Sequence, residues 1–186
     1  MRGIRRGLVV LSLFMSMLVL NACGEEPADF TMFMMAQGAV PSEITTAIQD
    51  DLTEQYKDQF TIQVVSPPMY NIQRLLIEYA ANKNSLIILP KDDIKAYSRN
   101  GGHIVLDSYF DQEQYAEGVM EGLVEPGDGK EKKDVLEEHL YALPVSKLPF
   151  MEKHGVTNPE FLIAIPANAP NVERSVEVLK MMIDKQ

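Results

Sequence analysis

The chain has 186 residues, and its 17 Lys and Arg against 27 Asp and Glu give a formal net charge of −10 at pH 7. A surface this acidic repels phosphate groups, which excludes nucleic acid as a partner. The single cysteine excludes a framework of intramolecular disulfides, so stability must come from a packed core.

The first 22 residues have the pattern of an export signal. Three arginines lie within residues 1–6, residues 8–20 are apolar apart from two serines, and small or polar residues precede Cys23. The apolar run is shorter than the roughly 20 residues that cross a bilayer core, so we expect residues 1–22 to be removed. Their removal takes away three basic residues and no acidic one, which leaves a net charge of −13.

Cys23 ends the sequence Leu20-Asn21-Ala22-Cys23. This ending resembles the lipobox of bacterial lipoproteins, in which the cysteine sulfur receives a diacylglyceryl group and becomes the new N-terminus. A thiolate is nucleophilic enough for that transfer. The alternative is an ordinary secretory signal followed by an unpaired cysteine. The resemblance implies that lipid attached to Cys23 holds the protein on the outer face of the cell membrane. The lipid is needed for this, because the acidic surface of the protein repels anionic headgroups.

Residues 24–29 are acidic and contain a proline, which favours a short lipidated tether over residues 23–29. The remaining residues 30–186 have a suitable length for one domain. We see no linker that divides them. They alternate apolar runs of strand length with amphipathic stretches of helical period.

The strands and helices are expected in alternation. Apolar runs predict strands at residues 30–36, 60–65, 85–89, 141–145 and 161–165, and apolar stripes predict helices over residues 44–56, 72–80 and 172–183. A further helix follows Pro90 and ends at Gly101-Gly102, with Asp92 as its candidate N-cap. Because apolar runs without alternation are typical of strands buried on both faces, we predict an α/β domain with a mostly parallel sheet and flanking helices.

The segment between the third and fourth expected strands is the least regular. Residues 111–122 predict a weak helix that contains Gly118, and the charged residues 125–138 predict a solvated loop leading into a short helix.

Three segments occur in an order that points to one family. They are Ser85-Leu86-Ile87-Ile88-Leu89-Pro90 followed by Gly101-Gly102 and Ile104-Val105-Leu106-Asp107, then Leu140-Tyr141-Ala142-Leu143-Pro144-Val145-Ser146, then Ile163-Ala164-Ile165-Pro166-Ala167-Asn168-Ala169-Pro170-Asn171. This order resembles the extracellular sugar-type solute-binding lipoproteins of ABC importers. The resemblance covers most of residues 30–110 and 139–186.

The chain departs from that family in one respect. Complete members have two α/β lobes that close on a ligand, whereas here only residues 111–138 stand where a second lobe would be inserted. We expect those residues to supply helices and a loop but no second sheet. The resemblance therefore implies a single lobe of the periplasmic-binding-protein type, without closure on a ligand.

Open parallel sheets bind ligands beyond the carboxyl ends of their strands, and polar residues follow several of the expected strands. The candidate ligand-binding residues are Gln37, Tyr70, Lys91, Asp92 and Asn168. Gln37, Asp92 and Asn168 can hydrogen-bond hydroxyl groups, and the Tyr70 ring can stack on a sugar ring. The alternative is structural, with Asp92 and Asn168 as helix caps and Tyr70 in the core.

Nothing in the sequence predicts an enzyme. There is no Gly-x-Ser-x-Gly elbow, phosphate-binding loop, His-Glu-x-x-His motif or metal-spaced Cys/His cluster. His103, His139 and His154 stand where surface or helix-cap residues belong. We expect no catalytic residue and no cofactor.

Several methionines lie in the first expected strand and the last helix. Met32, Met34, Met35, Met181 and Met182 are thioethers of the kind that suits Cu(I). Methionine also fills buried gaps between a strand and a helix, which is the role we expect, so no metal site is predicted.

The predicted function is that of an extracytoplasmic, membrane-anchored lipoprotein. It is accessory to the uptake of an oligosaccharide or other solute and contacts a partner protein, either a component of an ABC importer or a surface enzyme. The alternative is a stand-alone receptor that binds a saccharide weakly at the open strand ends.

Overall fold

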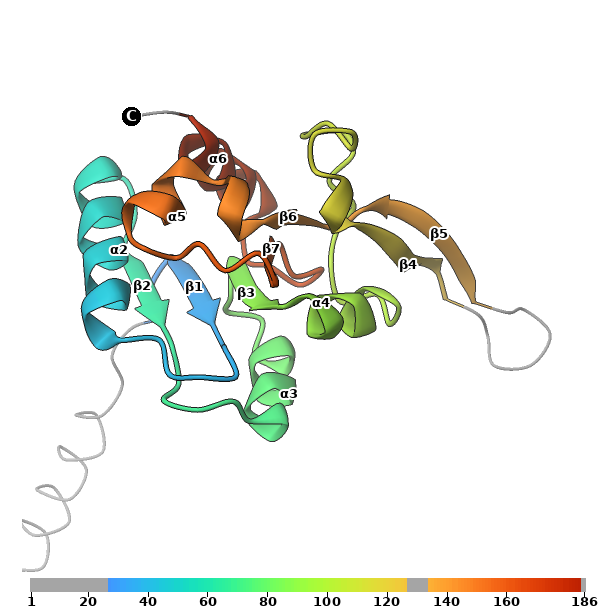
Figure 1. The fold of residues 1–186 in the computed structure, drawn as a ribbon, viewed down its shortest axis with the longest axis horizontal. Helices are drawn as coiled ribbons and strands as arrows, with labels where there is room; N and C mark the ends of the chain where they lie inside the picture. Colours follow the sequence, from blue (N-terminus) through green and yellow to red (C-terminus); the bar gives the residue numbers. More distant parts are fainter. Residues whose placement is uncertain (1–26, 127–133, 185–186) are drawn as a thin grey trace, which may run out of the picture.

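The structure is a computed structural model that describes residues 27–126 and 134–184 (Figure 1). The predicted signal peptide, Cys23 and most of the tether lie outside these residues. Within the described ranges, no helix is both long enough and apolar enough to cross a membrane.

A five-stranded sheet with the order β2-β1-β3-β7-β6 forms the centre of the domain. β1 pairs in parallel with β2 and β3, and β7 runs antiparallel to β3 and β6, so four of the five strands share one direction. The bounds are β1 (Phe30–Met34), β2 (Ile62–Val65), β3 (Leu86–Pro90), β6 (Ala142–Pro144) and β7 (Phe161–Ala164). The predicted fold class and all five predicted strands are confirmed.

Helices cover both faces of this sheet. One face carries α2 (Ser42–Gln55), α5 (Pro149–Lys153), which follows the 3₁₀ turn η2 (Val145–Lys147), and α6 (Val172–Ile183), and the other carries α3 (Ile72–Ala80) and α4 (Lys91–Ser98). α3 and α6 each begin after an asparagine whose side chain accepts a backbone N–H of the first turn, Asn71 from Arg74 and Asn171 from Arg174.

β1 shows why its sequence is apolar without alternation. Met32 and Met34 pack with the α2, α5 and α6 side, whereas Phe33 and Met35 pack with the α3 and α4 side. All four side chains are at most 1% exposed, as is Met182 on α6. The expected core role is confirmed for Met32, Met34, Met35 and Met182, and Met181 is partly buried against the same core.

Residues 111–138 differ from the expectation. After a 3₁₀ turn, η1 (Ala116–Gly118), the strands β4 (Val119–Glu125) and β5 (Val135–Leu140) pair antiparallel and form a two-stranded ribbon that projects from the body (Figure 1). The predicted helix over residues 111–122, the predicted short helix before residue 138 and the expected lack of a second sheet are therefore wrong. Most of the predicted loop lies outside the described residues.

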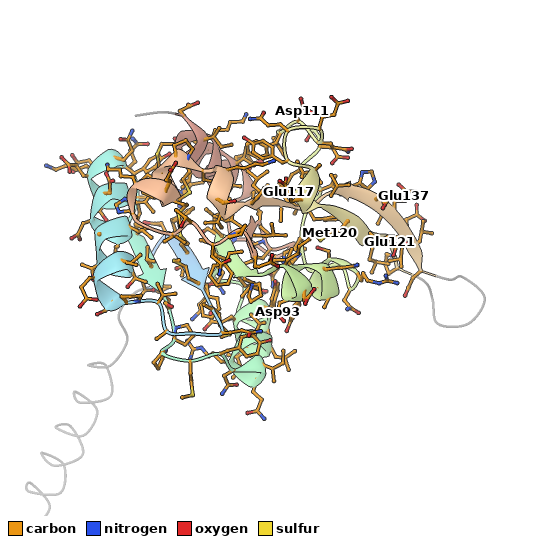
Figure 2. All side chains as sticks on the ribbon, in the orientation of Figure 1. Asp93, Asp111, Glu117, Met120, Glu121 and Glu137 are labelled. Atoms are coloured by element: carbon orange, nitrogen blue, oxygen red, sulfur yellow. The ribbon has the colours of Figure 1, made fainter. Side chains whose placement is uncertain are left out.

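Two glycines explain the ribbon. An added Cβ at Gly118 would lie 1.7 Å from the Ala142 carbonyl oxygen, and one at Gly122 would lie 2.2 Å from the Tyr141 ring. Because neither glycine has a side chain, the backbone of β4 and η1 can lie close to Ala142 and Tyr141. Gly118 is therefore not a weak point in a helix, contrary to the prediction. Between the two glycines Met120 is buried and Glu121 is exposed (Figure 2). The Glu121 carboxylate lies 2.7 Å from the guanidinium of Arg99, which follows the last residue of α4.

One of the three histidines lies where it was predicted, and two do not. His154 follows α5 as a helix cap, as predicted, and its Nε2 lies 3.0 Å from Asp51 Oδ2. His139 lies on β5 and not at the end of a helix. His103 is buried, with 4% of its surface exposed, so its predicted surface position is wrong.

His103 joins the two helices on its face of the sheet. Its Nδ1 lies 2.8 Å from Ser98 Oγ of α4, and its Nε2 lies 2.7 Å from the Tyr79 hydroxyl of α3. The Tyr79 ring stacks on Tyr97 with 3.8 Å between centroids. Burial lowers the pKa of His103 to about 3, so the imidazole is neutral at pH 7.

Candidate functional site

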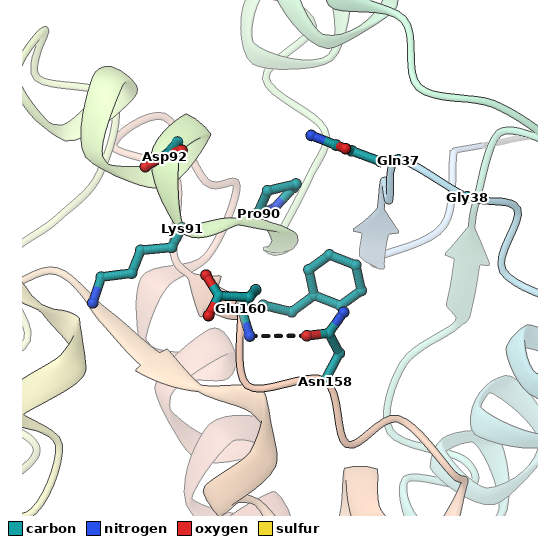
Figure 3. Close-up of a pocket in the computed structure, with 8 residues that line it drawn as sticks. Gln37, Gly38, Pro90, Lys91, Asp92, Asn158 and Glu160 are labelled. Carbon is teal, nitrogen blue, oxygen red and sulfur yellow. Dashed lines mark hydrogen bonds between the residues drawn. The ribbon is translucent and has the colours of Figure 1, made fainter.

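A groove lies at the edge of the sheet where β1 and β3 end. Its polar part encloses about 320 Å³ and is lined by Gln37, Gly38, Pro90, Lys91, Asp92, Asn158, Glu160 and Phe161 (Figure 3). A second, more apolar depression of about 390 Å³ shares Gly38, Asn158 and Phe161 and adds Ala36, Ala39, Val40, Pro41, Ile44, Gly155, Val156 and Thr157. We call these two adjoining depressions the edge groove.

The sheet topology brings the polar residues together. β1 and β3 are parallel neighbours, so Gln37 and the first residues of α4 leave the sheet at the same edge. β7 runs in the opposite direction, so it begins at this edge, where Phe161 pairs with Pro90. The Lys91 backbone N–H donates to the Glu160 carbonyl at 2.8 Å, which ties the start of α4 to the segment before β7.

A turn at Asn158 shapes the floor of the groove. The Asn158 side-chain oxygen accepts the backbone N–H of Glu160 at 2.9 Å (Figure 3), and its carbonyl accepts that of Phe161 at 3.2 Å. Asparagine favours such turns because its side chain can bond the backbone two residues ahead. The turn therefore sets the positions of the Glu160 carboxylate and the Phe161 ring before any ligand arrives.

The groove presents hydrogen-bonding groups beside an apolar wall. Gln37, Lys91, Asp92, Asn158 and Glu160 are exposed and supply two amides, an ammonium and two carboxylates. The apolar wall is formed by the partly buried Phe161, Val40 and Ile44 and the buried Val156. This arrangement suits a ligand with hydroxyl groups on one side and a carbon surface on the other.

Three predicted site residues, Gln37, Lys91 and Asp92, meet in the edge groove. Asp92 is not the N-cap of α4, because Pro90 has that position. The Asp92 carboxylate lies instead in the first turn, where the positive end of the helix dipole favours a negative charge. It is exposed there, so the same side chain can stabilise the helix and contact a ligand.

Tyr70 does not line the groove. It packs with the core on the α3 and α4 side, and its hydroxyl donates to Asp93 Oδ1 at 2.9 Å. Burial, together with Asp93, raises the pKa of Tyr70 to about 12. The structural alternative described for this residue therefore fits its position.

Asn168 lies at the opposite edge of the sheet. The prediction assumed a parallel last strand, but β7 is antiparallel to β3, so the loop after it points away from Gln37. The Asn168 side-chain amide donates to the Tyr79 carbonyl at 2.6 Å and contacts Asn82. It is not a helix cap either, since Asn171 caps α6.

The sequence interpretation missed Asn158, Glu160 and Phe161. Their signal was the turn sequence Asn158-Pro159-Glu160 directly before an apolar run. That signal predicts a turn before a strand, but it does not show at which edge of the sheet the strand begins.

Neither a scan against protein-family models nor a search of curated proteins gave a match. Solved structures are similar to part of the fold. An extracellular solute-binding protein of family 1 from Alicyclobacillus acidocaldarius subsp. acidocaldarius DSM 446 has 16% identity and a TM-score of 0.42, over 65% of this chain and 29% of that one. A protein from Synechococcus sp. MITs9220, provisionally described as an oligosaccharide periplasmic-binding protein, has 11% identity and a TM-score of 0.40, over 62% and 26%.

A third structure, CpMnBP1 with mannotriose bound, has 16% identity and a TM-score of 0.37, over 64% of this chain and 28% of that one. The chain thus spans less than a third of the length of each of these proteins. Each match is to part of a longer protein, and the first two are named as solute-binding or periplasmic-binding proteins, the class that the sequence resembles.

Proposed function

We propose that this protein is a lipid-anchored, extracytoplasmic accessory protein, which assists the uptake of an oligosaccharide or another solute by an ABC importer through contact with a partner protein. The edge groove is the observation that supports this function best. Its lining residues come from the ends of β1 and β3 and from the segment before β7, so they contact a ligand from one side.

A groove of this kind binds weakly when it acts alone. Small-molecule sites that bind tightly bury 70–90% of the ligand surface, which requires walls on more than one side. A partner that covers the groove supplies the missing wall. The partner in this proposal is an importer subunit, a full-length binding protein or a surface enzyme, and the protein itself carries out no catalytic step.

The contact can be tested by photo-crosslinking on intact cells. A photoreactive amino acid at Gln37, on the groove, is expected to crosslink to a subunit of an ABC importer or to a binding protein that serves one. The control is the same amino acid at Ala167, which is exposed at the opposite edge of the sheet. Equal yields at the two positions, or no importer protein among the products at Gln37, would count against the accessory function.

The second candidate function is that of a stand-alone saccharide receptor. The hydroxyl-binding groups and the apolar wall of the edge groove favour it. Because the groove covers only one side of a ligand, calorimetric titration of the purified protein with a panel of oligosaccharides is expected to give dissociation constants of roughly 1 mM or weaker, about −4 kcal/mol. A micromolar constant for any of them would support the receptor over the accessory protein.

A further inference from the structure

The outer face of α3 is the most apolar part of the described surface. Met69, just before the helix, is 67% exposed, and Ile72, Leu76 and Ile77 on the helix are 50%, 57% and 60% exposed. These four residues, which we call the α3 face, are four of the six exposed large apolar side chains in residues 27–126 and 134–184. Apolar side chains gathered in this way mark sites of interaction with a protein or a membrane.

The charges around the α3 face differ from those of the whole chain. The segment of residues 66–83 contains one carboxylate, Glu78, and two cationic side chains, Arg74 and Lys83. The Glu78 side chain is 1% exposed and lies 2.6 Å from Arg74 and 3.4 Å from Lys83, whose own side chains are 45% and 41% exposed. Residues 66–83 themselves therefore present cations beside the apolar side chains and keep their carboxylate buried, in a chain whose net charge is −10. The neighbouring carboxylate Asp93 on α4 is partly buried and accepts from the Tyr70 hydroxyl.

α3 ends toward the sheet edge at which β1 begins and the predicted tether joins the domain, and the loop after α3 reaches the start of β1. The Ser85 N–H donates to the Thr31 carbonyl at 2.8 Å, two residues after Asp29. On the other side, Asn168 bonds the Tyr79 carbonyl, and Arg174 on α6 donates to the Asp29 carbonyl at 3.0 Å. α3 thus ends at the sheet edge from which residues 23–29 lead to the lipid site.

The length of that tether limits how far this edge can lie from the membrane. The seven residue steps from Cys23 to Phe30 span at most about 25 Å when fully extended. A lipid on Cys23 therefore keeps Phe30, at the start of β1, within about that distance of the bilayer surface, and α3 ends toward the same edge of the sheet. The effective concentration of lipid around the α3 face is correspondingly high.

We infer that the α3 face rests on the lipid bilayer, with its four apolar side chains in the interface and Arg74 and Lys83 toward anionic headgroups. This inference rests on the proposed lipid anchor. An apolar helix face flanked by cations is the pattern of interfacial helices, and its contact adds to that of the lipid chains. A second copy is a poorer occupant, because a nine-residue helix is only about 14 Å long and stable interfaces bury about 800 Å² per partner.

Contact between the α3 face and the bilayer would also determine where the edge groove lies relative to the membrane. α3 begins near the edge where β2 ends and finishes toward the opposite edge, where β1 and β3 begin. A helix that lies flat on the bilayer therefore keeps both edges of the sheet, including the one with the groove, at the membrane surface. A membrane-embedded importer subunit is then within reach of the groove.

Tryptophan fluorescence can test the contact directly, because the chain has no tryptophan of its own. The lipidated full-length gene product, extracted from membranes, is placed in vesicles of phosphatidylcholine and phosphatidylglycerol with brominated acyl chains, which quench tryptophan on contact. The variants Leu76→Trp and Ile77→Trp should lose more than half of their emission relative to unbrominated vesicles and shift it to shorter wavelength. The control is Tyr109→Trp, at a 40% exposed aromatic position beside Lys180 of α6, on the other face of the sheet from α3, which should keep its emission.

Flotation of the vesicles distinguishes a failure of the membrane contact from a failure of the proposed lipid anchor. Protein that floats with the vesicles but shows no more quenching at positions 76 and 77 than the Tyr109→Trp control would overturn the membrane contact and assign the α3 face to a protein partner. Protein that does not float would overturn the contact and the anchor together. The anchor has its own test, since Cys23→Ala should abolish incorporation of labelled fatty acid, and equal labelling of this variant and the parent would overturn the lipoprotein assignment alone.

Discussion

Replacing Gly118 with alanine is expected to destabilise the domain more than any other single methyl addition at the described glycines. The new Cβ would lie 1.7 Å from the Ala142 carbonyl oxygen and 2.7 Å from its carbonyl carbon, which belong to β6 in the central sheet. Backbone in a sheet cannot move aside as a flexible side chain can. We expect a loss of about 3 kcal/mol, the upper part of the usual range for overpacking.

Thermal unfolding followed by circular dichroism measures this loss. For a domain of this size, about 3 kcal/mol corresponds to a fall in Tm of roughly 6–12 °C. Gly38→Ala is the matched control, because nothing lies within 4 Å of the added Cβ, and its Tm should stay within a degree or two of the parent. Equal Tm values for the two variants would show that the contact between η1 and β6 is looser than described.

Acidification is expected to destabilise the protein through His103. Burial lowers the pKa of His103 to about 3 in the folded state, whereas in the unfolded chain it is about 6.5. Between these values the unfolded chain binds a proton that the folded chain does not. The stabilisation is therefore fully present above pH 6.5 and falls as the pH decreases toward 3, by about 2 kcal/mol at pH 5.

Urea unfolding at pH 7 and pH 5 checks this expectation. His103→Gln should be less stable than the parent at pH 7, because the bonds to Ser98 and Tyr79 are disturbed, but it should lose about 2 kcal/mol less on acidification. His139→Gln is the control and should retain the acid loss, since hydrogen bonding to Asp107 and Glu137 raises the pKa of His139. If the parent and His103→Gln lost the same stability between pH 7 and pH 5, His103 would not be the source of the acid destabilisation.

The buried histidine also shows why part of the structure could not be predicted. In the sequence His103 follows Gly101-Gly102, a helix stop, and nothing local distinguishes a surface position from a buried one. Its burial depends on Tyr79, which lies 24 residues earlier on another helix, and on a bridge between His103 and Pro166 at the sheet edge. Contacts of this kind depend on how α3, α4 and β7 assemble.

Local patterns were enough for the strands of the main sheet and for α2, α3, α4 and α6, whereas the short helix α5 was not predicted. The runs around β1, β3 and β7 are apolar because these strands are buried on both faces, and the stripes on α2, α3 and α6 repeat at the helical period, so burial and period can be recognised in the sequence itself. The same reasoning placed Gln37, Lys91 and Asp92 together, since parallel neighbouring strands end at one edge.

Strand direction and long-range pairing were decided only in the tertiary structure. The apolar run of β7 has the same appearance whether the strand is parallel or antiparallel, and its antiparallel pairing with β3 moved Asn168 to the far edge and brought Asn158, Glu160 and Phe161 to the groove. The ribbon of β4 and β5 depends likewise on Gly118 and Gly122 approaching Ala142 and Tyr141. The burial pattern and the period of a segment can be recognised in that segment alone. The direction of a strand, the sheet edge at which its loops lie and the close contacts of its backbone depend on which segments pack together, and the packing of the whole chain sets them.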